Sequence, residues 1–417
     1  MINCYEVLKE LDFEHLAGSP EEAQAREIIK KHLDKAKINY EEQPFTMYGF
    51  DTGDSQIIAG DIKVETLPYG LVETQTIEGE LVVIDNIKIV ELNKGAFKDK
   101  IVMCKGGSRN AFDSMYKQGV KAFIQISSPA QEASNMSHRQ KSVETGMLPA
   151  VTISYDNAIK LLPKNGSHIT LKIQQERFER TAYNIVATIG EAKLDQNITY
   201  LTAHYDTVAR SHGSSDNGAG TVVILKAAQY FAEKNPERLL KVIFCSGEEM
   251  GLLGSSAYVE THLEEVKENG AFVLNVDVAG DYFGSDLMMV IGTNELKGYL
   301  SGISKEAGYC FNDSVDIYSS DAMPFSVYEV PSVNLARFGG NASTVIHTIK
   351  DNMDNIYAQN LEFYYNATVN ILERVLSSKI WLIDKAIDAS LKTKIEKYMW
   401  GSRRVEPKLE WVPAYRK

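Results

Sequence analysis

The sequence predicts an α/β fold, in which helices flank a mostly parallel mixed sheet, with a mainly β domain inserted into it. A chain of 417 residues is too long for one ordinary core. From residue 181 onward apolar strands alternate with helices, whereas between residues 43 and 175 the strands are short and alternate apolar with polar residues. We therefore expect one discontinuous domain, 1–42 and 176–417, and an inserted domain at 43–175.

The first 40 residues are predicted to be helical. Ser19, Pro20 and Glu22 form a capping box with proline at the first helical position, and residues 25–38 carry an apolar stripe. The inserted segment begins with short strands and closes with a strand, helix, strand unit at 99–128. It holds no cluster of His, Asp and Glu, so we expect no chemistry from it. Its first strands are predicted at 46–50, 55–60, 61–70 and 79–86.

The segment after residue 181 supplies the parallel part of the sheet. Its strands are near-continuously apolar, as expected when helices cover both faces. Ligands of such sheets bind beyond the carboxyl ends of the strands, so the residues that follow each strand are the candidates for chemistry. The strands are predicted at 198–203, 240–246, 271–280 and 287–293, and the helices at 220–235, 251–267 and 294–308.

Composition excludes several classes of protein. The shares of hydrophobic residues (44%) and charged residues (24%) are typical of a globular chain. A net charge of -12 would be repelled by nucleic acid and by an anionic membrane, and no window of about 18 apolar residues predicts a membrane span. The first residues do not resemble a secretion signal, and the four scattered cysteines predict reduced thiols. Both observations favour a cytoplasmic protein.

Polar residues gather where the predicted strands end. They include two histidines and several carboxylates but no thiolate, a ligand set that suits zinc and also cobalt or manganese. Two ions roughly 3.5–4 Å apart need a bridging carboxylate. Asp216, in a loop of glycines and serines that can bend sharply, fits that position. The full set is His204, Asp206, Asp216, Glu248, Glu249, Asp277 and His347.

Each of these residues also has a simpler explanation. His204 and Asp206 could form a surface pair. Glu248 and Glu249 could begin a solvated helix, where acidic residues favour the dipole. Asp277 is harder to explain in this way, because a carboxylate in an apolar strand is costly to bury without a partner. Since such groups fall at successive strand ends, the sequence predicts a metal site.

Five segments resemble the ordered motifs of the co-catalytic dizinc aminopeptidases, the bacterial leucyl aminopeptidase group in the superfamily of glutamate carboxypeptidase and the transferrin receptor. They are TAHYDTV, SSDNGAG, CSGEEMGLLGS, VLNVDVAG and VIHTIKDNMDNI. The resemblance covers about residues 181–375 and the first helices, and it implies a zinc exopeptidase fold. KDKIVMCKGG and QGVKAFIQISS resemble the protease-associated domain that several members carry as an insertion at this point.

The resemblance implies the ligands of two Zn²⁺ ions per chain. His204 and Asp277 would bind one zinc. Glu249 and His347 would bind the other, and Asp216 would bridge both. The peptide bond after Asp216 would be cis, and cobalt or manganese could take the place of zinc.

The resemblance also implies roles in the chemistry. Asp206 would accept the second ring N–H of His204 and fix its tautomer, and Glu248 would be the general base. Tyr318, in VDIYSSDAMPF, would hydrogen-bond the oxyanion, although a packing role explains it equally well. The family has a histidine after the Ser-Asp pair of this segment. Here Ala322 takes its place, and we have no functional account of that departure.

The implied function is a metal-dependent aminopeptidase acting on peptides with a free N-terminus. A water activated by two zinc ions would attack the first peptide bond, and the glutamate would carry its proton to the leaving amine. The alternative is a carboxypeptidase or dipeptidase on the same site, for which Arg337 could clamp a substrate carboxylate. A catalytically silent binding protein, as the transferrin receptor is, should lack ligands, yet all five and the base are present here.

The stretch from Lys379 to the C-terminus lies beyond the resemblance. Its tryptophans Trp381, Trp400 and Trp411 make it too apolar for a free tail. It could pack on the catalytic domain or on another subunit, so the sequence leaves a homo-oligomer open.

Overall fold

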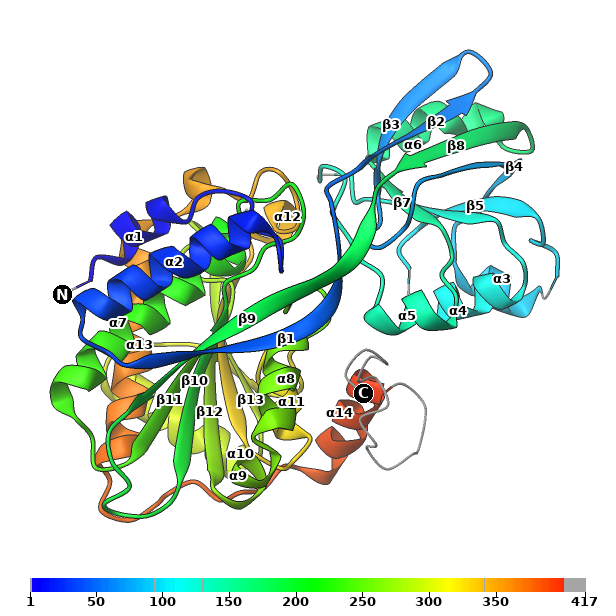
Figure 1. Cartoon of the computed structure of the whole chain (residues 1–417). Helices are drawn as coiled ribbons and strands as arrows, with labels where there is room; N and C mark the ends of the chain where they lie inside the picture. The colour runs from blue at the N-terminus through cyan, green and yellow to red at the C-terminus, as the bar shows by residue number, and fades with distance from the viewer. Residues whose placement is uncertain (1, 94, 108, 130, 341, 401–417) are drawn as a thin grey trace.

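A computed structural model of the protein describes residues 2–93, 95–107, 109–129, 131–340 and 342–400. A helix-flanked sheet and a separate barrel form two bodies, which the long strands β1 and β9 connect (Figure 1). Within the described residues, no helix is long and apolar enough to cross a membrane. Trp411 lies outside the described residues.

The larger body is built on an eight-stranded mixed sheet, with strand order β1-β9-β11-β10-β12-β15-β13-β14. Its centre is parallel, because β10 pairs in parallel with β11 and β12, and β12 with β15. Strands β9 and β13 join this centre in antiparallel fashion. The prediction of a mixed α/β fold is therefore confirmed. The strands are β1 (Tyr40–Phe50), β9 (Arg177–Ile189), β10 (Ile198–His204), β11 (Leu239–Cys245), β12 (Gly270–Val276), β13 (Ser285–Ile291), β14 (Asn312–Val315) and β15 (Ser332–Phe338).

Helices cover both faces of this sheet, as the continuous apolar strands indicated (Figure 1). Leu201 of β10 belongs to the core under α1, α2, α7, α10 and α13, whereas its neighbour Tyr200 packs with α8, α9 and α11 on the other face. The helices are α1 (Cys4–Glu10), α2 (Pro20–Lys35), α7 (Ala219–Lys234), α8 (Leu253–Thr261), α9 (Leu263–Glu268), α10 (Asn294–Glu306), α11 (Met323–Ser326), α12 (Ala342–Val345), α13 (Ala358–Ser377) and α14 (Ala389–Trp400), with short turns at Ser214–Gly218 and Met353–Asn355.

The smaller body is a closed barrel with strand order β2-β3-β7-β6-β5-β4-β8. Strand β5, helix α4 and strand β6 form the predicted strand, helix, strand unit, and the two strands pair in parallel. The chain leaves the large sheet after β1 and returns to it with β9, which pairs along the whole of β1. The domain division at 43–175 stays a prediction. The elements are β2 (Asp54–Ala59), β3 (Ile62–Pro68), β4 (Gln75–Val83), α3 (Lys88–Leu92), β5 (Lys100–Lys105), α4 (Arg109–Lys117), β6 (Ala122–Ile126), α5 (Gln140–Thr145), β7 (Ala150–Ile153), α6 (Tyr155–Leu161), a turn at Leu162–Lys164 and β8 (His168–Gln174).

The N-terminal segment folds as two helices rather than one, because the residues between them contact loops of the sheet. Asp12 in this break accepts a hydrogen bond of 2.8 Å from the hydroxyl of Ser214. Ser19 caps α2 by accepting from the N–H of Glu22 at 3.0 Å, which is one half of the predicted capping box; the other half does not form, because the N–H of Ser19 donates to the carbonyl of Leu16. The Glu22 carboxylate accepts from the N–H of Gly18 and from the hydroxyl of Ser246, so the start of α2 is tied to the end of β11.

Helix α8 packs unusually close to the loop that follows β11. The N–H of Gly254 donates to the carbonyl of Ser246 at 2.9 Å, and the side chain of Asn184 bonds both residues. A Cβ added to Gly254 would lie 2.2 Å from the Ser246 carbonyl oxygen and 2.3 Å from Asn184 Oδ1. Only glycine at position 254 lets α8 approach the Ser246 backbone this closely. The resulting contact fixes the loop that carries Glu248 and Glu249.

Substitution of Gly254 by alanine tests this packing. We expect Gly254→Ala to lower the free energy of unfolding by about 1–3 kcal/mol, because overpacking forces the backbone to move. Gly298→Ala is the matched control, since Gly298 is exposed on α10 and a Cβ there meets no described atom within 4 Å. In urea titrations the control should be neutral or more stable by up to about 1 kcal/mol. Equal effects of the two variants would contradict the packing argument.

Candidate metal centre

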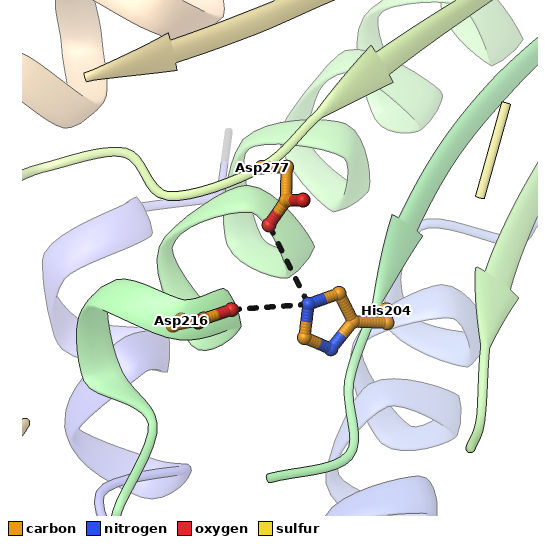
Figure 2. A group of neighbouring side chains, drawn as sticks. All are labelled: His204, Asp216 and Asp277. Atoms are coloured by element: carbon orange, nitrogen blue, oxygen red, sulfur yellow. Dashed lines mark ion pairs between the residues drawn. The ribbon is translucent and has the colours of Figure 1, made fainter. Parts of the chain in front are cut away.

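The first group of candidate ligands lies at the carboxyl ends of two neighbouring parallel strands. His204 is the last residue of β10, Asp277 follows β12, and Asp216 lies in the turn before α7 (Figure 2). The Nε2 atom of His204 is 3.2 Å from Asp216 Oδ1 and 3.4 Å from Asp277 Oδ1. All three side chains are buried, so the fold brings one imidazole and two carboxylates together away from bulk water.

The second group shares Asp216 with the first. The Nε2 atom of His347 is 3.3 Å from Asp216 Oδ2 and 3.1 Å from Glu249 Oε2. Within each group the candidate ligand atoms lie within 4.8 Å of one another. The two carboxylate oxygens of Asp216 thus face different histidines, which is the arrangement of a bridging ligand between two cations.

The charges and hydrogen bonds of these residues fit cations. Among the described residues, neither Glu249 Oε1 nor Asp277 Oδ1 has a hydrogen-bond partner, although both atoms are buried. Such atoms are costly unless another group satisfies them. Burial opposes a positive charge on His204, yet the carboxylates of Asp206, Asp216 and Asp277 raise its pKa well above the usual range. The site therefore strongly favours positive charge, and imidazole with carboxylate is a ligand set of zinc.

Asp206 links the first histidine to the loop of the two glutamates. Its carboxylate accepts the backbone N–H groups of Glu248 at 3.1 Å and Glu249 at 3.4 Å. The Nδ1–H of His204 donates to the backbone carbonyl of Asp206 at 3.1 Å, whereas the nearest carboxylate oxygen is 3.6 Å away. This contact leaves Nε2 of His204 free to bind a metal.

Glu248 and Glu249 do not begin a helix, because α8 starts only at Leu253. The side chain of Glu249 is 6% exposed and faces His347. Desolvation raises the pKa of Glu248 well above its usual range, His204 lowers it, and the negative charge of Glu249 raises it further. A carboxyl group with a raised pKa accepts a proton readily, which suits a general base.

Asp351 and Asn217 hold the Asp216 turn, and the sequence reasoning gave neither of them a role. The carboxylate of Asp351 accepts the N–H groups of Ser215 at 2.7 Å and Asp216 at 3.1 Å. The Asn217 amide donates to the carbonyl of Val276 at 2.8 Å, next to Asp277. Asp351 follows His347 by four residues in HTIKD, and an acidic residue so close to a candidate ligand was the signal that the sequence offered. The bond between Asp216 and Asn217 is cis, as the resemblance implied.

The ring centroid of Tyr318 is 6.2 Å from that of Phe338. Desolvation raises the pKa of Tyr318 well above its usual range, and the negative charges of Asp277 and Asp216 add to the rise. Its hydroxyl therefore stays protonated. Arg337 is engaged elsewhere: its guanidinium donates to Asp286 at 2.6 Å and to the backbone carbonyl of Asp281 at 2.9 Å.

Comparison with known proteins finds a family that resembles the segment carrying this arrangement. Residues 184–371 match the sequence profile of Peptidase family M28, and this segment includes both candidate ligand groups. The aminopeptidase YwaD of Bacillus subtilis is 27% identical over 224 residues, which cover 52% of this chain and 49% of the relative. The chain thus spans about half the length of this curated relative.

Two solved structures share the fold over nearly the whole chain. The zinc aminopeptidase of Bacillus subtilis aligns with a TM-score of 0.74 at 19% identity and covers 94% of this chain and 98% of that one. The aminopeptidase of Aneurinibacillus sp. strain AM-1 aligns with a TM-score of 0.72 at 22% identity and covers 93% and 96%. Residues 184–371, which carry both candidate ligand groups, are therefore similar to peptidase family M28, and the fold around them is shared with the two aminopeptidases.

Proposed function

We propose that this protein is an aminopeptidase that removes the N-terminal residue of peptides with two Zn²⁺ ions and a glutamate general base. The observation that carries the proposal is the orientation of Asp216, whose two oxygens lie 3.2 Å and 3.3 Å from the Nε2 atoms of His204 and His347. A carboxylate so placed fits between two ions. The relative and the two structural neighbours named above are also aminopeptidases, one of them a zinc enzyme.

Each zinc would have an imidazole, a terminal carboxylate and the shared carboxylate as ligands. His204 and Asp277 would bind the first ion, Glu249 and His347 the second, and Asp216 both. Cobalt or manganese can be held by the same atoms. We also propose that the barrel is the protease-associated-like domain that the resemblance implied.

In the proposed reaction the two ions, when bound, would supply an activated water molecule and would polarise the scissile carbonyl. Glu248 accepts the proton of the water and returns it to the leaving amine. Its position is set by the bond from its own N–H to Asp206. Tyr318 stays protonated and can donate a hydrogen bond to the carbonyl oxygen as negative charge develops there.

The aminopeptidase is favoured over a carboxypeptidase or dipeptidase by the surroundings of Arg337. Its guanidinium already pairs with Asp286 at 2.6 Å, and its side chain is only 14% exposed. A substrate carboxylate would have to displace that ion pair. The two ligand groups instead contain several carboxylates, and their negative charge can attract the free α-amine of a peptide.

Replacement of Glu248 by glutamine tests the general base. We expect Glu248→Gln to lower kcat by about 10²–10⁴-fold, because the amide cannot accept the proton, while two zinc ions per chain remain bound. The metal content can be measured by atomic emission after gel filtration. Glu268→Gln, an exposed substitution on α9, is the control and should retain the parental rate. Parental turnover in the Glu248 variant would remove this residue from the mechanism.

Removal of metal tests the cofactor. Dialysis against a chelator should abolish peptide hydrolysis, and two equivalents of zinc should restore it, with cobalt or manganese restoring part. Magnesium is the control and should not restore activity, because it prefers oxygen ligands in a near-ideal octahedral geometry. If the metal-free protein retains full activity, the metallopeptidase proposal is wrong.

A pair of substrates distinguishes the two kinds of exopeptidase. An aminoacyl nitroanilide has a free amine and no carboxylate, whereas an N-acylated dipeptide has a free carboxylate and no amine. We expect hydrolysis of the nitroanilide alone, because Arg337 is occupied by Asp286. Hydrolysis of only the acylated dipeptide would establish the carboxypeptidase or dipeptidase alternative.

A further inference from the structure

The barrel contacts the backbone of a candidate metal ligand. Asn135 lies between β6 and α5 of the barrel and is 6% exposed. Its backbone N–H and its side-chain Nδ2 both donate to the carbonyl oxygen of His347, at 2.8 Å and 3.2 Å. We propose that Asn135 is a positioning residue that orients His347, so that the barrel helps to determine how tightly the second metal ion binds. This inference rests on the proposed dizinc function.

His347 needs such support more than the other histidine does. His204 ends a central strand of the sheet and is buried. His347 follows the short helix α12, its side chain is 32% exposed, and its φ of 61° lies in the left-handed region. A residue with a Cβ adopts this conformation only when its surroundings hold it there. The two hydrogen bonds from Asn135 fix the peptide plane that leaves His347 and thereby favour this conformation.

Asn135 can impose an orientation because the barrel holds it on both sides. Before it, the carbonyl of Ser134 accepts the hydroxyl of Thr152 on β7 at 2.7 Å. After it, the carbonyl of Met136 accepts the N–H of Gly70 at 2.7 Å. The Gly70 carbonyl in turn accepts the N–H of His138 at 3.1 Å.

The loop that carries Asn135 packs closely against Gly70 of the barrel. A Cβ added there would lie 2.4 Å from both Ser137 Oγ and a ring carbon of Phe50. The loop around Asn135 is thus packed on the barrel. Its position relative to His347 therefore depends on how the barrel is docked on the large sheet.

Two neighbouring contacts between the described residues of the two bodies involve no candidate ligand. Gln131 Nε2 donates to the carbonyl of Ser343 at 3.1 Å, and Glu132 pairs with Lys350 at 2.8 Å. The Glu132–Lys350 pair is well exposed and contributes little to stability. Gln131 provides a matched control, because it lies in the same loop and also donates a side-chain amide to a carbonyl of the segment around His347.

The test compares Asn135→Ala and Asn135→Leu with Gln131→Ala. Leucine has the same number of side-chain heavy atoms and the same branching as asparagine but no amide, so it removes the Nδ2 hydrogen bond and leaves the bond from the backbone N–H of residue 135. Retention of the fold is checked by circular dichroism and gel filtration. The two zinc dissociation constants are measured by competition with a fluorescent chelator. Reference variants His347→Ala and His204→Ala identify which constant belongs to which ion. The absorption spectrum of the cobalt-loaded protein reports the geometry of each site.

We expect both Asn135 variants to weaken the His347 ion about 10–100-fold, as loss of a partner that orients a ligand usually does. The His204 ion should change much less, the cobalt spectrum should change only in the band that His347→Ala removes, and Gln131→Ala should match the parent. Unchanged constants in the Asn135 variants would overturn the inference and leave the proposed function intact. Equal weakening in the Asn135 and Gln131 variants would also overturn it, because contact between the two bodies alone would then explain the effect. A parent protein that binds fewer than two zinc ions would instead overturn the proposed function.

Discussion

The site depends on the burial of one carboxylate between two imidazoles. Asp216 is 7% exposed and has one oxygen toward each histidine. Burial disfavours its charge, but the two histidines hold the pKa of Asp216 below its usual range. Glu249 and Asp277 add negative charge, so the carboxyl groups outnumber the imidazoles that face them. Such a cluster is stable only when positive charge is supplied, which is why its composition indicates cations.

The candidate ligands are held by hydrogen bonds between segments that are distant in the sequence. Asp351 ties the His347 segment to the Asp216 turn, Asn217 ties that turn to the strand before Asp277, and Asp206 ties the end of β10 to the two glutamates. Each of these side chains accepts or donates at a backbone group. The backbone that carries each candidate ligand is therefore fixed independently of the ligand itself, which is the preorganisation that a catalytic metal site requires.

The barrel is proposed to orient His347, although it holds no cluster of candidate ligands among its described residues. Its seven strands enclose a separate apolar core. It is connected to the site through the backbone N–H and the side-chain Nδ2 of Asn135, which both donate to the carbonyl oxygen of His347. Because Asn135 bonds the segment of His347 directly, whereas His204 ends a central strand of the sheet, we expect a shift of the barrel to act first on His347.

The sequence by itself determined the α/β class and the set of residues at the strand ends. Apolar strands that alternate with helices leave few arrangements, and the carboxyl ends of parallel strands meet at one edge, so His204 and Asp277 could be placed near each other from their positions alone. Only the tertiary structure decided that each oxygen of Asp216 faces a different histidine, that Arg337 is occupied by Asp286, and that Asn135 contacts His347 across 212 residues. Local periodicity reports which face of an element is buried. It cannot report hydrogen bonds between loops, because these depend on how separate bodies of the fold are docked.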